Sequence, residues 1–264
     1  MNNEQLNEFK TWFNNFVAGF YGSDEYVNVH LKLKEDHSAR VCDEMLYLCE
    51  QLNLNAGLRL LAETIALFHD VGRFPQFVKY KTYKDPLSVN HSVLAVETLQ
   101  KENILSPLSE NEKQIILTAI RYHGEKELPP NLTGDTMLMA RLIRDADKLD
   151  IFKVVIDSYI QKRNDPDNFK LEIEMPDTPD ITPGVLEAIL TGGRIEYRAL
   201  RTLNDMKLCI LGWVYDINFK PTFLRLRERR NLETIFHFLP DTPDIHKARD
   251  IIFSYVEERL KTAG

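Results

Sequence analysis

The residues with the clearest chemical potential are an adjacent histidine and aspartate, His69 and Asp70. They close an apolar run, residues 58–68, that is predicted to be a buried helix. Neighbours on a regular helix point about 100° apart, so both side chains can serve one site only where the helix ends or is distorted. Gly72 and Pro75 supply that break. Burying an imidazole and a carboxylate at one point is costly unless something compensates them, and a metal ion is the simplest compensation.

Further candidate metal ligands occur singly, at widely separated positions along the chain. Three histidines each occupy a separate predicted helix or its end: His37, His91 and His123. A carboxylate follows at Asp147, whose neighbours four and seven residues away in both directions are apolar. An unpaired carboxylate on such a core-facing stripe would cost several kcal/mol or take up a proton. Pairing it with a cation removes that penalty.

The donor set indicates the kind and number of ions. Neutral imidazoles with carboxylates suit Fe, Mn, Co, Ni or Zn, whereas Mg usually takes oxygen ligands. Four histidines and two aspartates exceed what one catalytic ion needs, because that ion must keep a position open for water. Two ions bridged by a shared carboxylate use all six residues. The sequence therefore predicts two divalent transition metal ions as cofactors.

The ordered set resembles the HD-domain metal-dependent phosphohydrolase superfamily, in the branch with a His, His-Asp, His, His, Asp two-metal site. The resemblance covers roughly residues 25–160 and includes the contexts His-Asp-Val-Gly-Arg-Phe and Asp-Ala-Asp-Lys-Leu-Asp. It implies an HD-domain helical bundle. It also implies a first ion held by His37, His69, Asp70 and Asp147, and a second ion that Asp70 shares with His91 and His123.

The resemblance further implies hydrolysis of a phosphate ester by metal-activated water. The expected substrate is a small phosphorylated metabolite or nucleotide; the Gly-Tyr-Pro signature of the cyclic-dinucleotide branch is absent. Asp70 and Lys148, which follows ligand Asp147, are the predicted catalytic residues. Lys148, Arg73 and Arg40 are the predicted phosphate contacts, because ammonium and guanidinium groups suit phosphate. Each of these three cations is equally suited to a salt bridge with a nearby acid.

Two alternative functions fit the same residues. Mixed-valent di-iron oxygenases on this fold show the same ligand order, and both reactions need a carboxylate between histidine-bound ions. A non-catalytic binding module in which the metal only stabilises the fold is the third hypothesis.

Composition narrows partners and location. The net charge of −7 argues against a long nucleic acid partner. No apolar stretch approaches 18 residues and the N-terminus lacks a basic or apolar leader, so we expect neither a membrane span nor a signal peptide. Three cysteines without a CxxC pair indicate free thiols in a reducing compartment, hence a cytoplasmic protein. The aromatic stripe from Phe9 to Phe20 suits the core or the seam of a homodimer.

Helical periodicity dominates the chain, so the predicted fold class is all-α. We expect an HD-type metal-binding helical core with an N-terminal helix in residues 1–163, and a C-terminal helical cap or appendage packed on the same core in residues 164–264. The expected irregular regions are a loop at 71–88 and a loop at 164–184 with an extended piece at Lys170–Glu174. The last helices are expected at about 183–192, 195–216, 221–238 and 244–261.

Overall fold

The computed structural model describes residues 1–167, 175–193 and 195–262. Within these ranges all regular structure is helical and no strand occurs, which confirms the all-α prediction. The predicted extended piece at Lys170–Glu174 lies outside the described residues. The chain divides into two units, residues 1–150 and 151–264. The domain boundary predicted from the sequence, between residues 163 and 164, was based on a change in composition. The packing of residues 164–264 on the metal-binding core stays a prediction.

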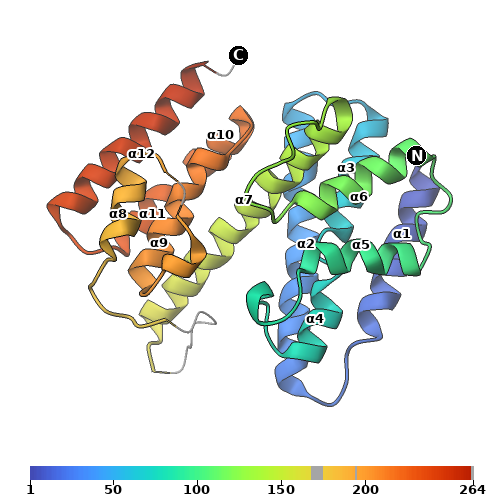
Figure 1. Cartoon of the computed structure of the whole chain (residues 1–264), viewed down its shortest axis with the longest axis horizontal. Coiled ribbons are helices and arrows are strands. Elements are labelled where there is room, and N and C mark those ends of the chain that lie inside the picture. Colours follow the sequence, from blue (N-terminus) through green and yellow to red (C-terminus); the bar gives the residue numbers. More distant parts are fainter. Residues whose placement is uncertain (168–174, 194, 263–264) are drawn as a thin grey trace. The chain divides into compact units, whose positions relative to one another are not determined.

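Unit 1 is a helical bundle (Figure 1), and five of its helices begin at side-chain caps. Its elements are α1 (Asn3–Ala18), α2 (Glu25–Gln51), α3 (Ala56–Phe68), α4 (Arg73–Tyr80), the 3₁₀ turn η1 (Asp85–Leu87), α5 (His91–Lys101), α6 (Glu110–Tyr122) and the first part of α7 (Gly134–Asn164). Asn2, Asp24, Asn55, Asn90 and Ser109 each accept a hydrogen bond from a backbone N–H of the following first turn. These polar residues fix where the helices start.

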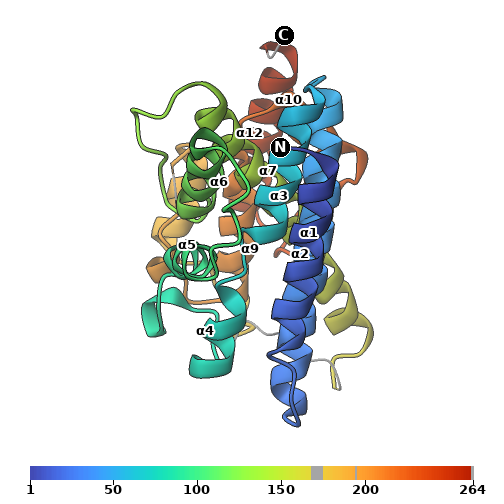
Figure 2. The ribbon, with the colours of Figure 1, turned by 90° about the vertical axis from the view of Figure 1, so that its right-hand side faces the viewer.

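Helix α3 is the centre of unit 1. It packs against α1, α2 and α6 (Figure 2). Phe68 at its C-terminal end is fully buried, and its ring centroid lies 5.6 Å from that of Phe9 on α1. Because α3 is held on several sides, its C-terminal end, where His69 and Asp70 follow, is a fixed point of the unit.

The prediction of a loop at residues 71–88 is wrong over its first half, because α4 forms there. Pro75 is the third residue of this helix, a position whose N–H has no intrahelical partner, so proline is tolerated there. Phe74, Gln76 and Phe77 are buried and hold α4 in place. The segment after the His-Asp pair is therefore a helix that carries Arg73.

Unit 2 is a second helical group. It contains the rest of α7 with α8 (Pro183–Leu190), η2 (Tyr197–Ala199), α9 (Leu203–Gly212), η3 (Trp213–Asp216), α10 (Lys220–Glu228), α11 (Asn231–His237) and α12 (Pro243–Thr262). Helix α12 packs against α8 and α10, and α9 packs against α8 and α11. The predicted single helix at 221–238 is two helices, because Arg230 adopts a left-handed φ of 54° between them. The predicted helix at 195–216 starts only at Leu203, after a capping box of Thr202 and Asp205.

Within the described ranges, none of the helices has the length and apolar character that crossing a membrane requires.

Candidate metal centre

The first cluster of donors combines His37 on α2 with His69 and Asp70 at the end of α3. The two Nε2 atoms of His37 and His69 lie 3.2 Å apart. The Asp70 Oδ2 atom lies 3.5 Å from the first of them and 3.7 Å from the second. All three residues are buried. We call His37 and His69 the first half-site.

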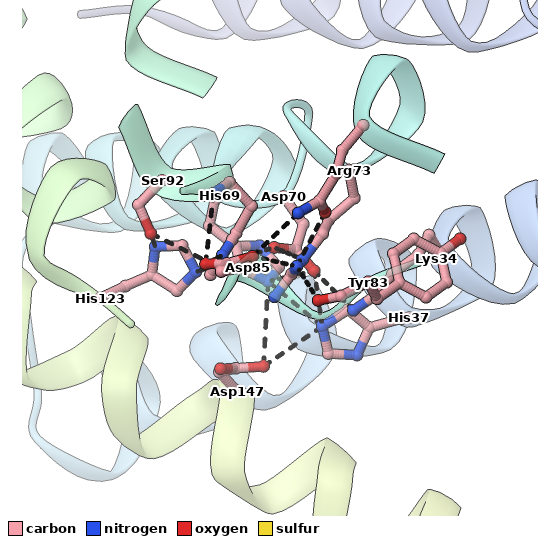
Figure 3. Close-up of polar contacts among 12 residues, drawn as sticks. Lys34, His37, His69, Asp70, Arg73, Tyr83, Asp85, Ser92, His123 and Asp147 are labelled. Atoms are coloured by element: carbon pink, nitrogen blue, oxygen red, sulfur yellow. Dashed lines mark hydrogen bonds and ion pairs between the residues drawn. The ribbon is translucent and has the colours of Figure 1, made fainter. Parts of the chain in front are cut away.

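The second cluster lies on the other oxygen of the same carboxylate (Figure 3). His91, the first residue of α5, and His123, which follows α6, have Nε2 atoms 3.1 Å apart. Each Nε2 lies 3.7 Å from Asp70 Oδ1. We call His91 and His123 the second half-site. The two oxygens of Asp70 thus face different histidine pairs, which is the placement of a bridging ligand.

Asp147 reaches the first half-site from α7 (Figure 3). Its Oδ1 lies 3.2 Å from His37 Nε2 and 3.9 Å from His69 Nε2. The side chain is 20% exposed, unlike the buried histidines. All six predicted ligands, which come from distant parts of the sequence, therefore meet at one point.

Gly72 allows the two half-sites to approach each other. A Cβ atom at this position would collide with the carbonyl oxygen of His91 and lie 2.6 Å from the backbone nitrogen of Ala95. Both neighbours are backbone atoms of α5, which cannot move aside as a flexible side chain could. The absence of a side chain therefore lets the His-Asp turn lie directly against the helix that carries His91.

The Gly72→Ala variant is expected to be less stable by about 1–3 kcal/mol, the usual cost of overpacking a tight contact. Because the clash pushes α5 away from Asp70, the variant should also bind its second ion more weakly. Urea unfolding and metal titration measure the two effects. Gly22→Ala is the matched control, because nothing lies within 4 Å of its Cβ position. An unchanged unfolding midpoint for Gly72→Ala would contradict the argument.

The tautomer of each histidine is fixed by the partner of its Nδ1 atom. The Nδ1 atoms of His69 and His123 each lie 2.7 Å from a backbone carbonyl oxygen, those of Ala66 and Ile120. Because a carbonyl oxygen can only accept, these Nδ1 atoms carry the proton. Their Nε2 atoms are therefore unprotonated in the neutral ring and present lone pairs to the centre.

The other two histidines have carboxylate partners. His37 Nδ1 lies 2.7 Å from Asp150, and His91 Nδ1 lies 2.6 Å from Asp85. Burial raises the pKa of both carboxyls, but hydrogen bonds from the histidines and the charges around them outweigh it; the pKa of Asp150 is lowered and that of Asp85 falls to about 2. Both groups are therefore ionised acceptors. When the rings are neutral, all four Nε2 atoms therefore direct lone pairs inward.

This arrangement fits two cations. Two nitrogen lone pairs that face each other at 3.1–3.2 Å cannot form a hydrogen bond. Asp70 Oδ1 is buried and has no hydrogen-bond partner within the described part of the chain. Buried polar atoms without partners are rare, and a cation at each half-site would satisfy the nitrogens and the carboxylate oxygen together.

The charge states at neutral pH also suit metal binding. Burial lowers the pKa of His69 and of His91 to about 4, so both rings are neutral. Burial raises the pKa of Asp70, but the positive charge of Lys34 and the nearby histidines outweigh it and hold that pKa well below its usual value. Burial and Lys34 lower the pKa of His37, yet the carboxylates of Asp147 and Asp150 outweigh them and raise it. A metal ion at the first half-site therefore competes with a proton at His37.

Three residues at the centre were not predicted from the sequence: Lys34, Asp85 and Asp150. Lys34 places its ammonium 2.8 Å from Asp70 Oδ2 (Figure 3). Lys34 lies three residues before His37, and Asp150 lies three residues after Asp147, so helical spacing could have indicated both. Asp85 lies in the turn after α4, where no periodic signal exists.

The predicted phosphate contacts have protein partners of their own. Arg40 contacts Asp150 through Nε and Nη2, at 2.5 and 3.1 Å. Arg73 contacts Asp85 at 2.8 Å. Lys148 donates from Nζ to the Arg144 carbonyl at 3.3 Å. The two arginines thus form the salt bridges that the sequence allowed, while contact of all three cations with a substrate stays a prediction.

Comparison with known proteins agrees with this geometry. No curated protein and no solved structure matches the chain. The family model described as HD domain matches residues 35–151, a range that contains all six predicted ligands. This match and the His/Asp clusters that could hold a metal lead to one conclusion: residues 35–151 form an HD domain.

Proposed function

We propose that this protein is a metal-dependent phosphohydrolase or phosphodiesterase that acts on a small phosphorylated metabolite or nucleotide. The observation that carries the proposal is the Asp70 carboxylate, which lies between two pairs of inward-facing imidazole Nε2 atoms. HD domains are generally metal-dependent hydrolases, and this donor set suits Fe, Mn, Co, Ni or Zn better than Mg.

The charge of the centre supports an anionic substrate. Four carboxylates and three cationic side chains surround the half-sites: Asp70, Asp85, Asp147, Asp150, Lys34, Arg40 and Arg73. With neutral imidazoles these groups sum to −1, and two divalent ions would change that sum to +3. A net positive centre in a chain of net charge −7 favours a phosphoryl group over a neutral substrate.

The chain's own residues then have defined tasks. Bound divalent ions would supply an activated water and neutralise charge on the phosphoryl oxygens. Asp70 and the four histidines would hold both ions, and Asp147 would complete the first half-site. Lys34, whose ammonium lies beside Asp70 and whose side chain is 16% exposed, would donate to a phosphoryl oxygen at this centre. Lys148, next to Asp147 in sequence, is proposed as a further contact of the same group.

The Lys34→Met variant is expected to lower kcat/KM for the phosphoester by about 10- to 100-fold, the range for losing a hydrogen bond to a charged group. Methionine keeps most of the apolar stem while the charge is lost, and Lys34 is not a candidate metal ligand, so metal content should stay at the wild-type level. Steady-state kinetics and elemental analysis give the two values. Lys32→Met is the control, because Lys32 lies on the same helix but pairs with Asp36, and its side chain is 57% exposed. Equal kinetics for the two variants would exclude Lys34 as a phosphate contact.

The proposed function is tested by elemental analysis of the purified protein together with a hydrolysis assay. The assay covers nucleoside phosphates, sugar phosphates and a generic phosphodiester, with each candidate metal added in turn. About two transition metal ions per chain and phosphate release from part of the panel would support the proposal.

Two other results would overturn it. Two irons per chain with substrate-dependent oxygen uptake and no phosphate release would identify the di-iron oxygenase alternative. Metal that stabilises the fold without any turnover would identify a binding module. These measurements do not test the cytoplasmic location or the homodimeric state, which both stay predictions from the sequence.

A further inference from the structure

The two half-sites are built to the same plan, beginning with one histidine that is anchored to the backbone. His69 directly follows α3 and His123 directly follows α6. Each ring lies 2.7 Å from the carbonyl oxygen of the residue three positions earlier, Ala66 or Ile120, and donates its Nδ1 proton to it. A backbone carbonyl is present whatever the side chain, so this anchor is the same in both half-sites.

The remaining histidine of the first half-site is anchored to a carboxylate that an arginine supports. His37 donates to Asp150 Oδ2 at 2.7 Å, and Asp150 accepts from Arg40 Nε at 2.5 Å and from Arg40 Nη2 at 3.1 Å. Asp150 is 1% exposed, so its charge is held inside the protein by these partners.

The second half-site repeats this arrangement with residues from a different part of the chain. His91 donates from Nδ1 to Asp85 Oδ2 at 2.6 Å, and Asp85 Oδ1 accepts from Arg73 at 2.8 Å and from Gln76 at 2.9 Å. The Arg73 Nη1 atom also lies 2.8 Å from Gln76 Oε1 and 2.7 Å from the Tyr83 carbonyl. These Nη1 contacts hold Arg73 against Asp85 and its neighbours, while Arg73 Nε lies 3.6 Å from Asp70 Oδ1.

We propose that Asp150 with Arg40 positions the first ion, that Asp85 with Arg73 positions the second, and that each pair sets the affinity of its own half-site independently. This inference rests on the two-ion centre of the proposed function. A carboxylate on the far nitrogen of a metal-binding histidine fixes the ring and makes its Nε2 more basic. The arginine keeps that carboxylate ionised and oriented through its rigid planar fork. Arg40 and Arg73 thereby become positioning residues and not phosphate contacts.

The test is Mn²⁺ titration of the metal-free full-length protein, followed by equilibrium dialysis and electron paramagnetic resonance. Coupled pairs of Mn²⁺ ions and isolated ions have different spectra. Asp85→Asn should weaken the second ion by about 10- to 100-fold and leave the first within about threefold. Asp150→Asn should do the reverse. In both variants the spectrum of isolated ions should replace that of the coupled pair at concentrations that fill both wild-type half-sites.

A histidine variant identifies which ion is affected. His123→Ala removes a donor of the second half-site and leaves the first half-site complete. In that background Asp150→Asn should still weaken the remaining ion by the same factor, and Asp85→Asn should have no further effect. Asp241→Asn is the matched control, because Asp241 lies 2.6 Å from Nε2 of an exposed histidine, His246, and both residues are far along the chain from the centre.

Several results would overturn the inference. Equal weakening of both ions by either aspartate variant would show one coupled site, and unchanged affinities would show that the carboxylates position nothing. If Arg73→Gln raises KM for a phosphoester while both ion affinities stay unchanged, Arg73 contacts the substrate. Arg73→Gln also replaces Asp85→Asn as the probe of the second half-site if the latter fails to fold. Failure of the proposed function itself would look different: two ions would bind and respond to the aspartate variants as described, but no substrate would be hydrolysed.

Discussion

The Asp70→Asn variant is expected to lose at least about 1,000-fold in hydrolytic rate, which corresponds to about 4 kcal/mol of transition-state stabilisation. The two oxygens of Asp70 face the two half-sites, at 3.5–3.7 Å from the Nε2 atoms of His37, His69, His91 and His123. The amide keeps the shape of the side chain but has one oxygen and no charge. It therefore cannot bridge two cations.

The same variant should retain less than two ions per chain after dialysis, and the loss of rate and of metal should occur together. Elemental analysis and the hydrolysis assay measure both quantities on one preparation. Asp36→Asn is the control: Asp36 lies on α2 near His37 in sequence, but it pairs with Lys32 at 2.8 Å and its side chain is 49% exposed. Normal turnover with two ions in Asp70→Asn would show that the bridging carboxylate is not needed.

The second large effect is expected from removing the ions with a chelator. An ion present at 100 times its dissociation constant stabilises the folded state by about 2.7 kcal/mol, so two ions contribute about 5 kcal/mol. The donors come from α2, α5, α7 and the residues that follow α3 and α6, so the ions connect five parts of unit 1. Metal-free protein should therefore unfold at a lower temperature than the metal-bound form.

Calorimetry with and without chelator measures this shift, and added Mn²⁺ or Fe²⁺ should restore the original melting temperature. The Asp70→Asn variant is the internal control, because a chain that holds its ions weakly should respond little to the chelator. Hydrogen exchange should increase on chelation around residues 66–73 and at the start of α5. A melting temperature that is the same with and without chelator would contradict ion binding at the clusters.

The six candidate ligands could be predicted from sequence for a physical reason. Each is chemically distinct from its apolar surroundings, and each lies in or next to a strongly periodic helix, where local spacing determines which way a side chain points. Asp147 illustrates this, because its apolar neighbours at helical spacing indicated an inward carboxylate, and its Oδ1 does lie 3.2 Å from His37.

The supporting residues depend on information that local spacing does not contain. Asp85 reaches His91 because the chain turns back after α4, and the spacing of residues within α4 does not specify that turn. Pro75 was interpreted as a helix breaker, although proline is compatible with the first turn of a helix. The helix break at Arg230 could not be predicted either, because no glycine in the sequence marks the position that adopts a left-handed φ. Lys34 and Asp150 are different: their helical spacing from the candidate ligands His37 and Asp147 was visible but was not used.

The hydrogen bonds on the four Nδ1 atoms have a consequence for metal selection. Every ring is oriented through its Nδ1 by a carbonyl or a carboxylate of the protein, at 2.6–2.7 Å. These partners are the same whichever divalent metal is bound. For such a site the intrinsic affinity series of the divalent metals applies, and the cellular supply of each metal decides which one is bound. Protein produced in media enriched in different metals should carry different ions, and assays of this protein need to control the growth medium as strictly as the buffer.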